Sequence, residues 1–166
     1  MYSDWLKING FEVNNNSLGR GKGLTSYYKG NIFHVSRIIK TSFYQMTKLS
    51  AGALDLIGVY RSKECTSTSF IDSLLSIMDL SKTTILCGDF NICYKKTKQH
   101  YIIQSLENLG FDQLVKEATH FQGGHIDQVY VKEGGSHIAV DVSIYSPYYC
   151  VKDHDALLIT VDLLKV

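Results

Sequence analysis

Asp89 and Asn91 bring a carboxylate and a carboxamide to the end of the apolar run 85–87, just after a glycine. Residues two apart on an extended backbone point to the same side, so both side chains can reach one small target. Asp89 offers negative charge and proton-accepting oxygens, and Asn91 offers a neutral donor and acceptor. A water molecule, a phosphate oxygen or a hard metal ion would suit this pair.

Two later segments supply further acids and an imidazole. Asp127 follows a Gly-Gly pair early in an apolar segment, and a carboxylate at such a buried edge needs a partner. His154, which follows Asp153, is a natural one, because an Asp–His dyad fixes the imidazole tautomer and raises its basicity for proton transfer. The alternative is that Asp127 caps a turn and His154 is a surface loop residue.

The composition is that of an ordinary globular domain. The 166 residues are 45% hydrophobic and 20% charged, with a formal net charge of +1, so no global field indicates a nucleic-acid partner, although a local basic rim would suffice. No apolar run approaches the roughly 20 residues of a membrane span. Residues 1–7 lack the apolar core of a signal peptide. We therefore expect an intracellular protein that is not secreted, with the nucleus as one candidate compartment.

Four cysteines, at positions 65, 87, 93 and 150, have no paired metal-ligand spacing and predict no disulfide framework.

Strand and helix signals alternate along the chain. Phe70, Ile71, Leu74, Leu75 and Met78 recur at helical spacing and predict one helix. The predicted helices are 69–80 and 98–109, the predicted strands are 22–29, 31–35, 41–49, 53–60, 82–89, 125–131, 137–145 and 156–162, and the most turn-like segment is 14–23. Many strands with two helices favour an α/β sandwich.

Three ordered motifs carry a resemblance to a known family. They are residues 87–91 (Cys-Gly-Asp-Phe-Asn), residues 119–131 with Gly-Gly-His-Ile-Asp at their centre, and residues 145–157 with Asp-His-Asp. In this order and spacing, the chain resembles the endonuclease/exonuclease/phosphatase family from about residue 4 to its end. It is most similar to the apurinic-type endonuclease domains of non-LTR retrotransposons and related mobile elements.

The resemblance implies a fold and a chemistry. The fold is a four-layer α/β sandwich of two packed mixed β-sheets (DNase I-like), with the active site where strand-end loops meet. The family cleaves phosphodiester or phosphomonoester bonds with a divalent metal. In this comparison Asp89 resembles the carboxylate that orients or deprotonates water, Asn91 the amide that holds a phosphate oxygen, His154 the imidazole that is oriented by Asp127 and stabilises phosphate charge, and Tyr60 the tyrosine that faces the phosphate.

The metal site is where the sequence departs from the family. Asp153 and Asp89 resemble metal-site acids, which implies Mg²⁺ or Mn²⁺. Family members begin with a strand bearing an Asn and a strand bearing a metal-binding Glu, whereas this sequence starts after both. We therefore expect a single, N-terminally incomplete domain over residues 1–166 that lacks the N-terminal strands, with a metal site weakened by the missing Glu. Lys152 beside Asp153 would weaken it further.

A nucleic-acid rim is predicted from Lys95, Lys96, Arg61 and Tyr148. The lysines equally fit a solvated loop, and a tyrosine cluster of this kind more often reflects packing at the rim. The other histidines, His120 included, are interpreted as surface or core residues.

The predicted function is a metal-dependent phosphodiesterase that nicks DNA for a mobile element. One alternative is a catalytically inactive remnant that serves as a nucleic-acid-binding or interaction module, since the missing Asn and Glu bear directly on activity. Another is a phosphatase acting on a small or lipid phosphate. The sequence predicts no membrane partner and leaves the oligomeric state open.

Overall fold

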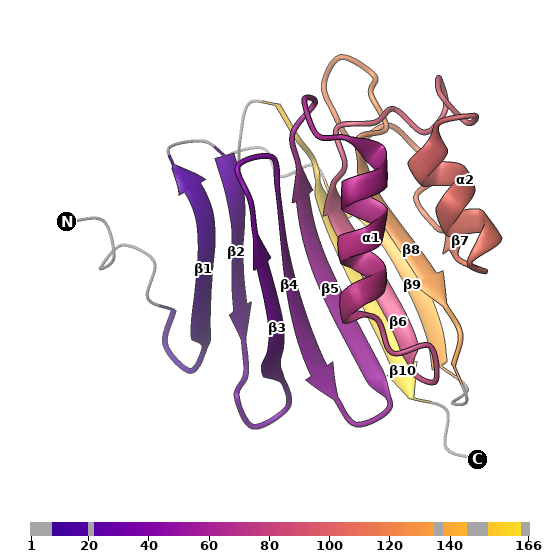
Figure 1. The fold of residues 1–166 in the computed structure, drawn as a ribbon. Helices are drawn as coiled ribbons and strands as arrows, with labels where there is room; N and C mark the ends of the chain where they lie inside the picture. The colour runs from indigo at the N-terminus through magenta and orange to yellow at the C-terminus, as the bar shows by residue number, and fades with distance from the viewer. Residues whose placement is uncertain (1–7, 20–21, 135–137, 146–152, 164–166) are drawn as a thin grey trace.

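The computed structural model describes residues 8–19, 22–134, 138–145 and 153–163 (Figure 1). Its elements, in chain order, are β1 (Glu12–Gly19), β2 (Lys22–Tyr28), β3 (His34–Lys40), β4 (Tyr44–Ala51), β5 (Leu54–Arg61), α1 (Ser67–Ile77), β6 (Thr83–Asp89), α2 (Tyr101–Asn108), β7 (Asp112–Gln113), β8 (Asp127–Lys132), β9 (Ile138–Tyr145) and β10 (Ala156–Leu163).

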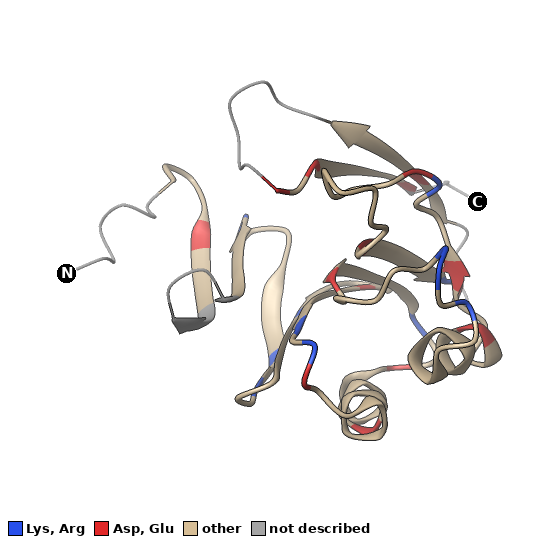
Figure 2. Ribbon diagram, turned by 90° about the horizontal axis from the view of Figure 1, so that it is seen from above, with Lys and Arg blue, Asp and Glu red and all other residues tan. Residues whose placement is uncertain are grey.

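A six-stranded mixed sheet in the order β3-β4-β5-β6-β8-β7 forms the centre of the molecule. Strands β5 and β6 are parallel and are joined through α1, and the other neighbours are antiparallel. Both helices cover one face of this sheet, and the pair β9–β10 lies over the other face (Figures 1 and 2). The α/β sandwich is thus confirmed. The described residues supply three of its layers, because both helices lie on the same face.

Two apolar clusters hold the layers together. The larger one fills the space between the helices and the sheet and includes Phe70, Leu74, Phe90 and Tyr130. The smaller one lies between the sheet and β9–β10 and contains Ile85 and other aliphatic side chains. Burial of these apolar side chains from water is the main favourable contribution to folding. In the described part of the chain, no helix has the length and apolar character needed to cross a bilayer.

Helix α1 confirms the predicted periodicity with shifted ends. It buries Phe70, Ile71 and Leu74 as expected, but it stops at Ile77 because Met78 is extended, with φ −73° and ψ 143°. Leu75, which we expected on the apolar face, is 41% exposed. The hydrophobic stripe of this helix is therefore narrower than its sequence indicates.

One turn prediction was wrong, and one predicted strand is shifted along the chain. Most of the segment expected to be a turn, residues 14–23, belongs to β1 and β2, which pair antiparallel with a register irregularity between Ser17 and Gly19. Pairing with β2 provides hydrogen-bond partners for the backbone of this asparagine-rich strand. In addition, the side chain of Asn14 accepts a hydrogen bond from Thr47 of β4 at 3.4 Å. The strand expected at 31–35 begins only at His34, after a turn. In the first case, antiparallel pairing between β1 and the next strand, β2, overrides the turn preference of the individual residues.

Candidate active site

Three side chains occupy one cross-strand row at one end of the central sheet. Tyr60 at the end of β5 pairs with Asp89 at the end of β6, and Asp89 pairs with Asp127 at the start of β8. Paired residues on neighbouring strands point to the same face of a sheet. The register therefore gathers a phenol and two carboxylates on the face opposite the helices.

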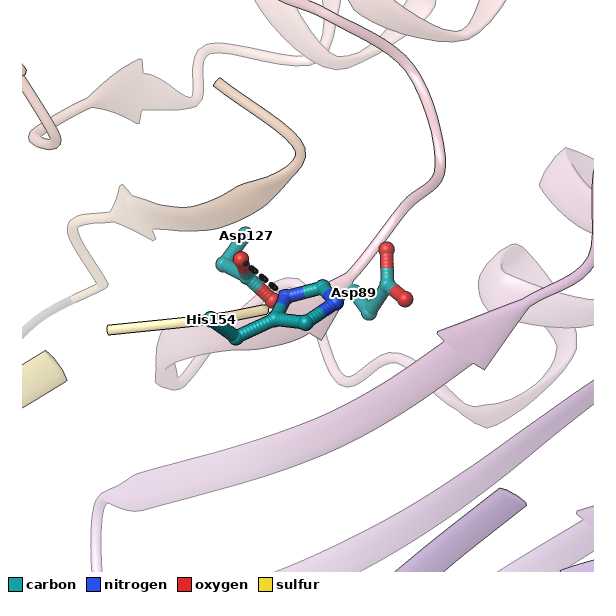
Figure 3. Close-up of side chains that lie close together, drawn as sticks. All are labelled: Asp89, Asp127 and His154. Carbon is teal, nitrogen blue, oxygen red and sulfur yellow. Dashed lines mark hydrogen bonds and ion pairs between the residues drawn. The ribbon is translucent and has the colours of Figure 1, made fainter. Parts of the chain in front are cut away.

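His154 joins this row from the last part of the chain. Its Nδ1 lies 2.8 Å from Oδ2 of Asp127, a residue 27 positions earlier (Figure 3). An isolated β-bridge between His120 and His154 fixes the backbone, and Asp155 N donates to Thr119 O at 2.8 Å. The alternative that His154 is an unattached surface residue is thereby excluded.

Thr119 contacts the candidate site, although our sequence analysis gave it no role of its own. It is fully buried, and its Oγ1 donates to Oδ2 of Asp127 at 2.8 Å and accepts from Asp127 N at 3.2 Å. The same carboxylate oxygen therefore faces both the hydroxyl of Thr119 and the imidazole of His154. Its place at the start of the second motif, residues 119–131, is the signal that could have identified it.

Asp89 and Asn91 meet as expected, but not through an extended backbone. Asn91 has a φ of +50°, in the left-handed region, and its N–H donates to Oδ1 of Asp89 at 2.8 Å. Its Nδ2 donates to Oδ2 of Asp89 at 3.2 Å and to Arg61 O at 2.7 Å. Asn91 thus holds the Asp89 carboxylate by two donors, in a turn that short polar side chains favour.

The position directly before Asp89 requires a glycine. Its φ is +140°, and a Cβ at this position would lie 2.0 Å from the carbonyl oxygen of Val59 on the neighbouring strand. Only a residue without a side chain allows β5 and β6 to approach this closely. The backbone contact in turn sets where Asp89 leaves the strand.

The pKa values of Asp89 and His154 are both shifted from their usual values. Burial raises the pKa of Asp89 to about 6, and the charge of Asp127 acts in the same direction, while the Asn91 N–H and the imidazoles of His154 and His120 oppose it. Burial lowers the pKa of His154, but the hydrogen bond to Asp127 and the charges of Asp127, Asp89 and Asp153 outweigh it, so the pKa is raised. A carboxyl and an imidazole with pKa values moved toward neutrality suit acid–base chemistry.

The same three side chains could hold a metal ion. Ligand atoms of Asp89, Asp127 and His154 all lie within 4.8 Å of one another, and each side chain is partly exposed. Asp153, predicted as a metal ligand, is exposed and lies on the wall of the adjoining pocket. Two carboxylates and an imidazole are a donor set that divalent ions accept.

A pocket of about 640 Å³ opens beside this group. Asn91, Asp153 and His154 line it, together with the cations Lys63 and Lys96 and a second imidazole, His120. His120, which we interpreted as a surface or core residue, therefore lines the pocket of the candidate site. Its ring stands edge-on to that of His154, with 5.0 Å between centroids.

Of the residues predicted for a nucleic-acid rim, the structure places some at the surface and one in the interior. Lys95 and Lys96 are exposed, and Lys96 lines the pocket. Arg61 is only 4% exposed, and its guanidinium donates to Phe90 O and Cys65 O, so it braces two loops and is not a rim cation. Burial raises the pKa of Tyr60, as do the charges of Asp89 and Glu64. Tyr148 lies outside the described residues.

Comparisons with known proteins identify the fold. No family model matches the sequence, and no curated protein matches it. The endonuclease domain of TRAS1, a telomere-specific non-LTR retrotransposon, is 14% identical and superposes with a TM-score of 0.68 over 95% of this chain and 81% of that chain. An endonuclease/exonuclease/phosphatase family protein from Leptotrichia buccalis C-1013-b is 13% identical, with a TM-score of 0.56 over 92% of this chain and 70% of that one. The predicted DNase I-like fold is confirmed.

Proposed function

We propose that this protein is a metal-dependent phosphodiesterase that cleaves nucleic acid, with DNA as the expected substrate. The observation that carries the proposal is the convergence of Asp89, Asp127 and His154 within 4.8 Å beside a pocket lined by lysines. The chain also shares its fold with the endonuclease domain of a retrotransposon. The convergence supports catalysis over the alternative of an inactive remnant, because binding alone does not require an Asp–His dyad.

Asp89 is the proposed base. Its carboxylate is held by the backbone and side-chain N–H groups of Asn91, which fixes the direction of its free lone pairs. With a pKa raised to about 6, it is a better proton acceptor than an ordinary aspartate and is still ionised at neutral pH. In the proposed reaction it orients the attacking water and takes up its proton. Contact between Asn91 and a phosphate oxygen, expected from sequence, remains a prediction.

His154 is the proposed phosphate-facing imidazole. Asp127 accepts from Nδ1, which leaves Nε2 to carry a proton toward the pocket. The raised pKa favours the charged imidazolium, which would stabilise negative charge as the phosphodiester bond breaks. Thr119 fixes the Asp127 carboxylate from the other side. Tyr60, next in the same row, is proposed to face the phosphate.

A divalent cation would bind at Asp89, with Asp153 on the pocket wall as a further proposed ligand, while Asp127 stays engaged with Thr119 and His154. Mg²⁺ and Mn²⁺ both accept carboxylate oxygens, so either ion suits these ligands, and the protonated imidazole of His154 stays outside the ligand set. When bound, such an ion neutralises phosphate charge and acidifies a bound water. Because at most three protein groups would hold the ion, coordination positions remain open for water and phosphate.

A nicking assay on supercoiled plasmid tests the proposal. Purified protein is incubated with Mg²⁺, with Mn²⁺ and with a chelator, beside the variants Asp89→Asn and His154→Ala. His34→Ala, which removes an exposed imidazole at the start of β3 and away from the site, is the matched control. We expect ion-dependent nicking by the wild type and the control, and its loss in both site variants.

The same assay separates the alternatives. Single-stranded DNA, RNA and a small phosphomonoester are offered in parallel. Hydrolysis of the phosphomonoester alone would replace the proposal with a phosphatase. Salt-sensitive DNA binding without cleavage by the wild type would replace it with a binding module. Nicking that is unchanged in Asp89→Asn and His154→Ala would show that another site, or a contaminant, is responsible.

A further inference from the structure

Three aromatic rings form a continuous row that leads out of the candidate active site. The ring of His154 is followed by that of His120, with centroids 5.0 Å apart and an interplanar angle of 87°. The ring of His120 is followed by that of Phe121, at 4.8 Å and 39°. Phe121 is 67% exposed, the highest value among the large hydrophobic side chains described. All three residues line the pocket beside Asn91.

The backbone holds Phe121 in a fixed position relative to His154. Phe121 N donates to Asp153 O at 3.1 Å, directly before His154 in the chain. Gly123 N closes a turn onto His120 O at 2.8 Å, with Gly123 at a φ of +77°. Gln122 N donates to Nδ1 of His120 at 3.2 Å, which orients that ring. The exposed ring is therefore presented by a braced turn.

The pocket combines this apolar ring with positive charge. Lys63 and Lys96 line it together with the two imidazoles. A small inorganic phosphate would use only the charged groups and would leave the aromatic ring in water. A nucleic acid uses both, because its phosphates match the cations and its bases stack on aromatic faces.

We propose that Phe121, backed by His120, stacks on a nucleobase adjacent to the phosphate bound at His154, and so selects a nucleic acid in which that base is unpaired. In an intact duplex both faces of a base are covered by its neighbours, so a protein ring gains access only at a single-stranded, frayed or mismatched position. The position of the base relative to the reaction rests on the function proposed above. The stacking itself is a binding event and is measurable without catalysis.

A fluorescent base reports the stacking directly. A single-stranded oligonucleotide carrying 2-aminopurine is titrated with protein in a chelator, so that metal-dependent cleavage cannot occur. We expect wild-type protein to quench the fluorescence, and Phe121→Ala to lose the quenching and to bind about 5- to 150-fold more weakly. Phe121→Tyr should keep both properties, and Phe121→Leu should keep neither. The fully paired duplex should bind more weakly and quench less.

Controls keep the result interpretable. Phe43→Ala removes another half-exposed phenylalanine that does not line the pocket, and it should behave as the wild type. Because Phe121 is so exposed, its removal should leave the unfolding transition unchanged, which circular dichroism checks. Equal quenching and affinity in wild type and Phe121→Ala, or full rescue by leucine, would overturn the proposal.

The two proposals fail in different ways. Quenching that depends on Phe121, without any nicking in Mg²⁺ or Mn²⁺, would leave the stacking surface standing and remove the proposed enzyme. Nicking that depends on Asp89 and His154, with no effect of Phe121 on quenching, would do the reverse.

Discussion

Asp89 faces Asp127 across the antiparallel pair β6–β8, at the last position that the two strands share. Two carboxylates held on one face repel each other when both are ionised, and Asp89 is also largely removed from water. His154 and His120 offset part of this repulsion. The strand register thus builds a site that gains from an added positive charge.

The first prediction concerns the pH dependence of stability. The folded-state pKa of Asp89 is raised from 3.8 to about 6, so the folded state binds this proton more tightly than the unfolded state does. The resulting stability is fully present below about pH 4 and is lost as the pH rises to about 6. Each pKa unit corresponds to about 1.4 kcal/mol, so the loss is on the order of 3 kcal/mol.

Asp89→Asn removes this titration. Urea unfolding of both proteins at pH 4 and pH 7.5 measures it, and the variant should gain stability relative to wild type at the higher pH. If the two proteins differ in their free energy of unfolding by the same amount at pH 4 and at pH 7.5, the account is contradicted.

The second prediction concerns the titration of His154. Its pKa is raised by the hydrogen bond to Asp127 and by the surrounding carboxylates, against the effect of burial. Asp127→Asn removes a negative charge next to Nδ1, so the pKa of His154 should fall. Imidazole chemical shifts followed by NMR across a pH series check this, with His34, which lies outside the site, as the internal reference. A pKa that stays the same or rises would show that Asp127 does not set the charge of His154.

Thr119 provides a third prediction, on how Asp127 is held. Thr119→Val keeps the shape of the side chain but leaves Asp127 without the hydroxyl that both donates to it and accepts from its N–H. Because the position is fully buried, we expect a loss of about 1–3 kcal/mol in the free energy of unfolding. Thr119→Ser retains the hydroxyl and should lose less. If serine costs as much as valine, packing rather than hydrogen bonding is what matters at this position.

Gly88 gives a fourth prediction, on the strand that carries Asp89. A Cβ at Gly88 would overlap the backbone of Val59, so Gly88→Ala must separate β5 from β6. We expect a destabilisation of about 3 kcal/mol or more, measured by chemical unfolding. Gly58→Ala is the matched control, because its Cβ would make only ordinary contacts, with the flexible end of Leu24 at 3.4 Å and with Thr47 O at 3.9 Å. Equal losses in both variants would contradict the proposed backbone contact.

Local sequence signals were sufficient where one pattern dominates. The apolar periodicity of α1 and the uniform apolar run of β6 predicted both elements within a few residues. The β1 strand was missed because asparagines favour turns locally, and only pairing with β2 reveals the strand. Strand β7 was missed because two residues carry no periodicity.

The central residues of the site could be predicted from sequence motifs. Asp89, Asp127 and His154 were chosen from ordered motifs, and the register and the β-bridge at His120 bring them together. Thr119, His120 and Phe121 belong to the second motif but were not singled out, because the contacts that bring them to the site are made with residues distant in sequence, such as Asp153 and His154. Arg61 was misplaced for the same reason, since its burial follows from the loops that close over it.

The central claim is that Asp127 and His154 act as one unit on the phosphate. Plasmid-nicking rates of wild type, Asp127→Asn, His154→Ala and the double variant, measured with saturating Mn²⁺, test it most directly. We predict that His154→Ala slows nicking by about 10²- to 10⁴-fold, and that adding Asp127→Asn slows it no further, because Asp127 acts through the imidazole. Single-variant effects that multiply in the double variant, or a wild type that does not nick, would contradict the account.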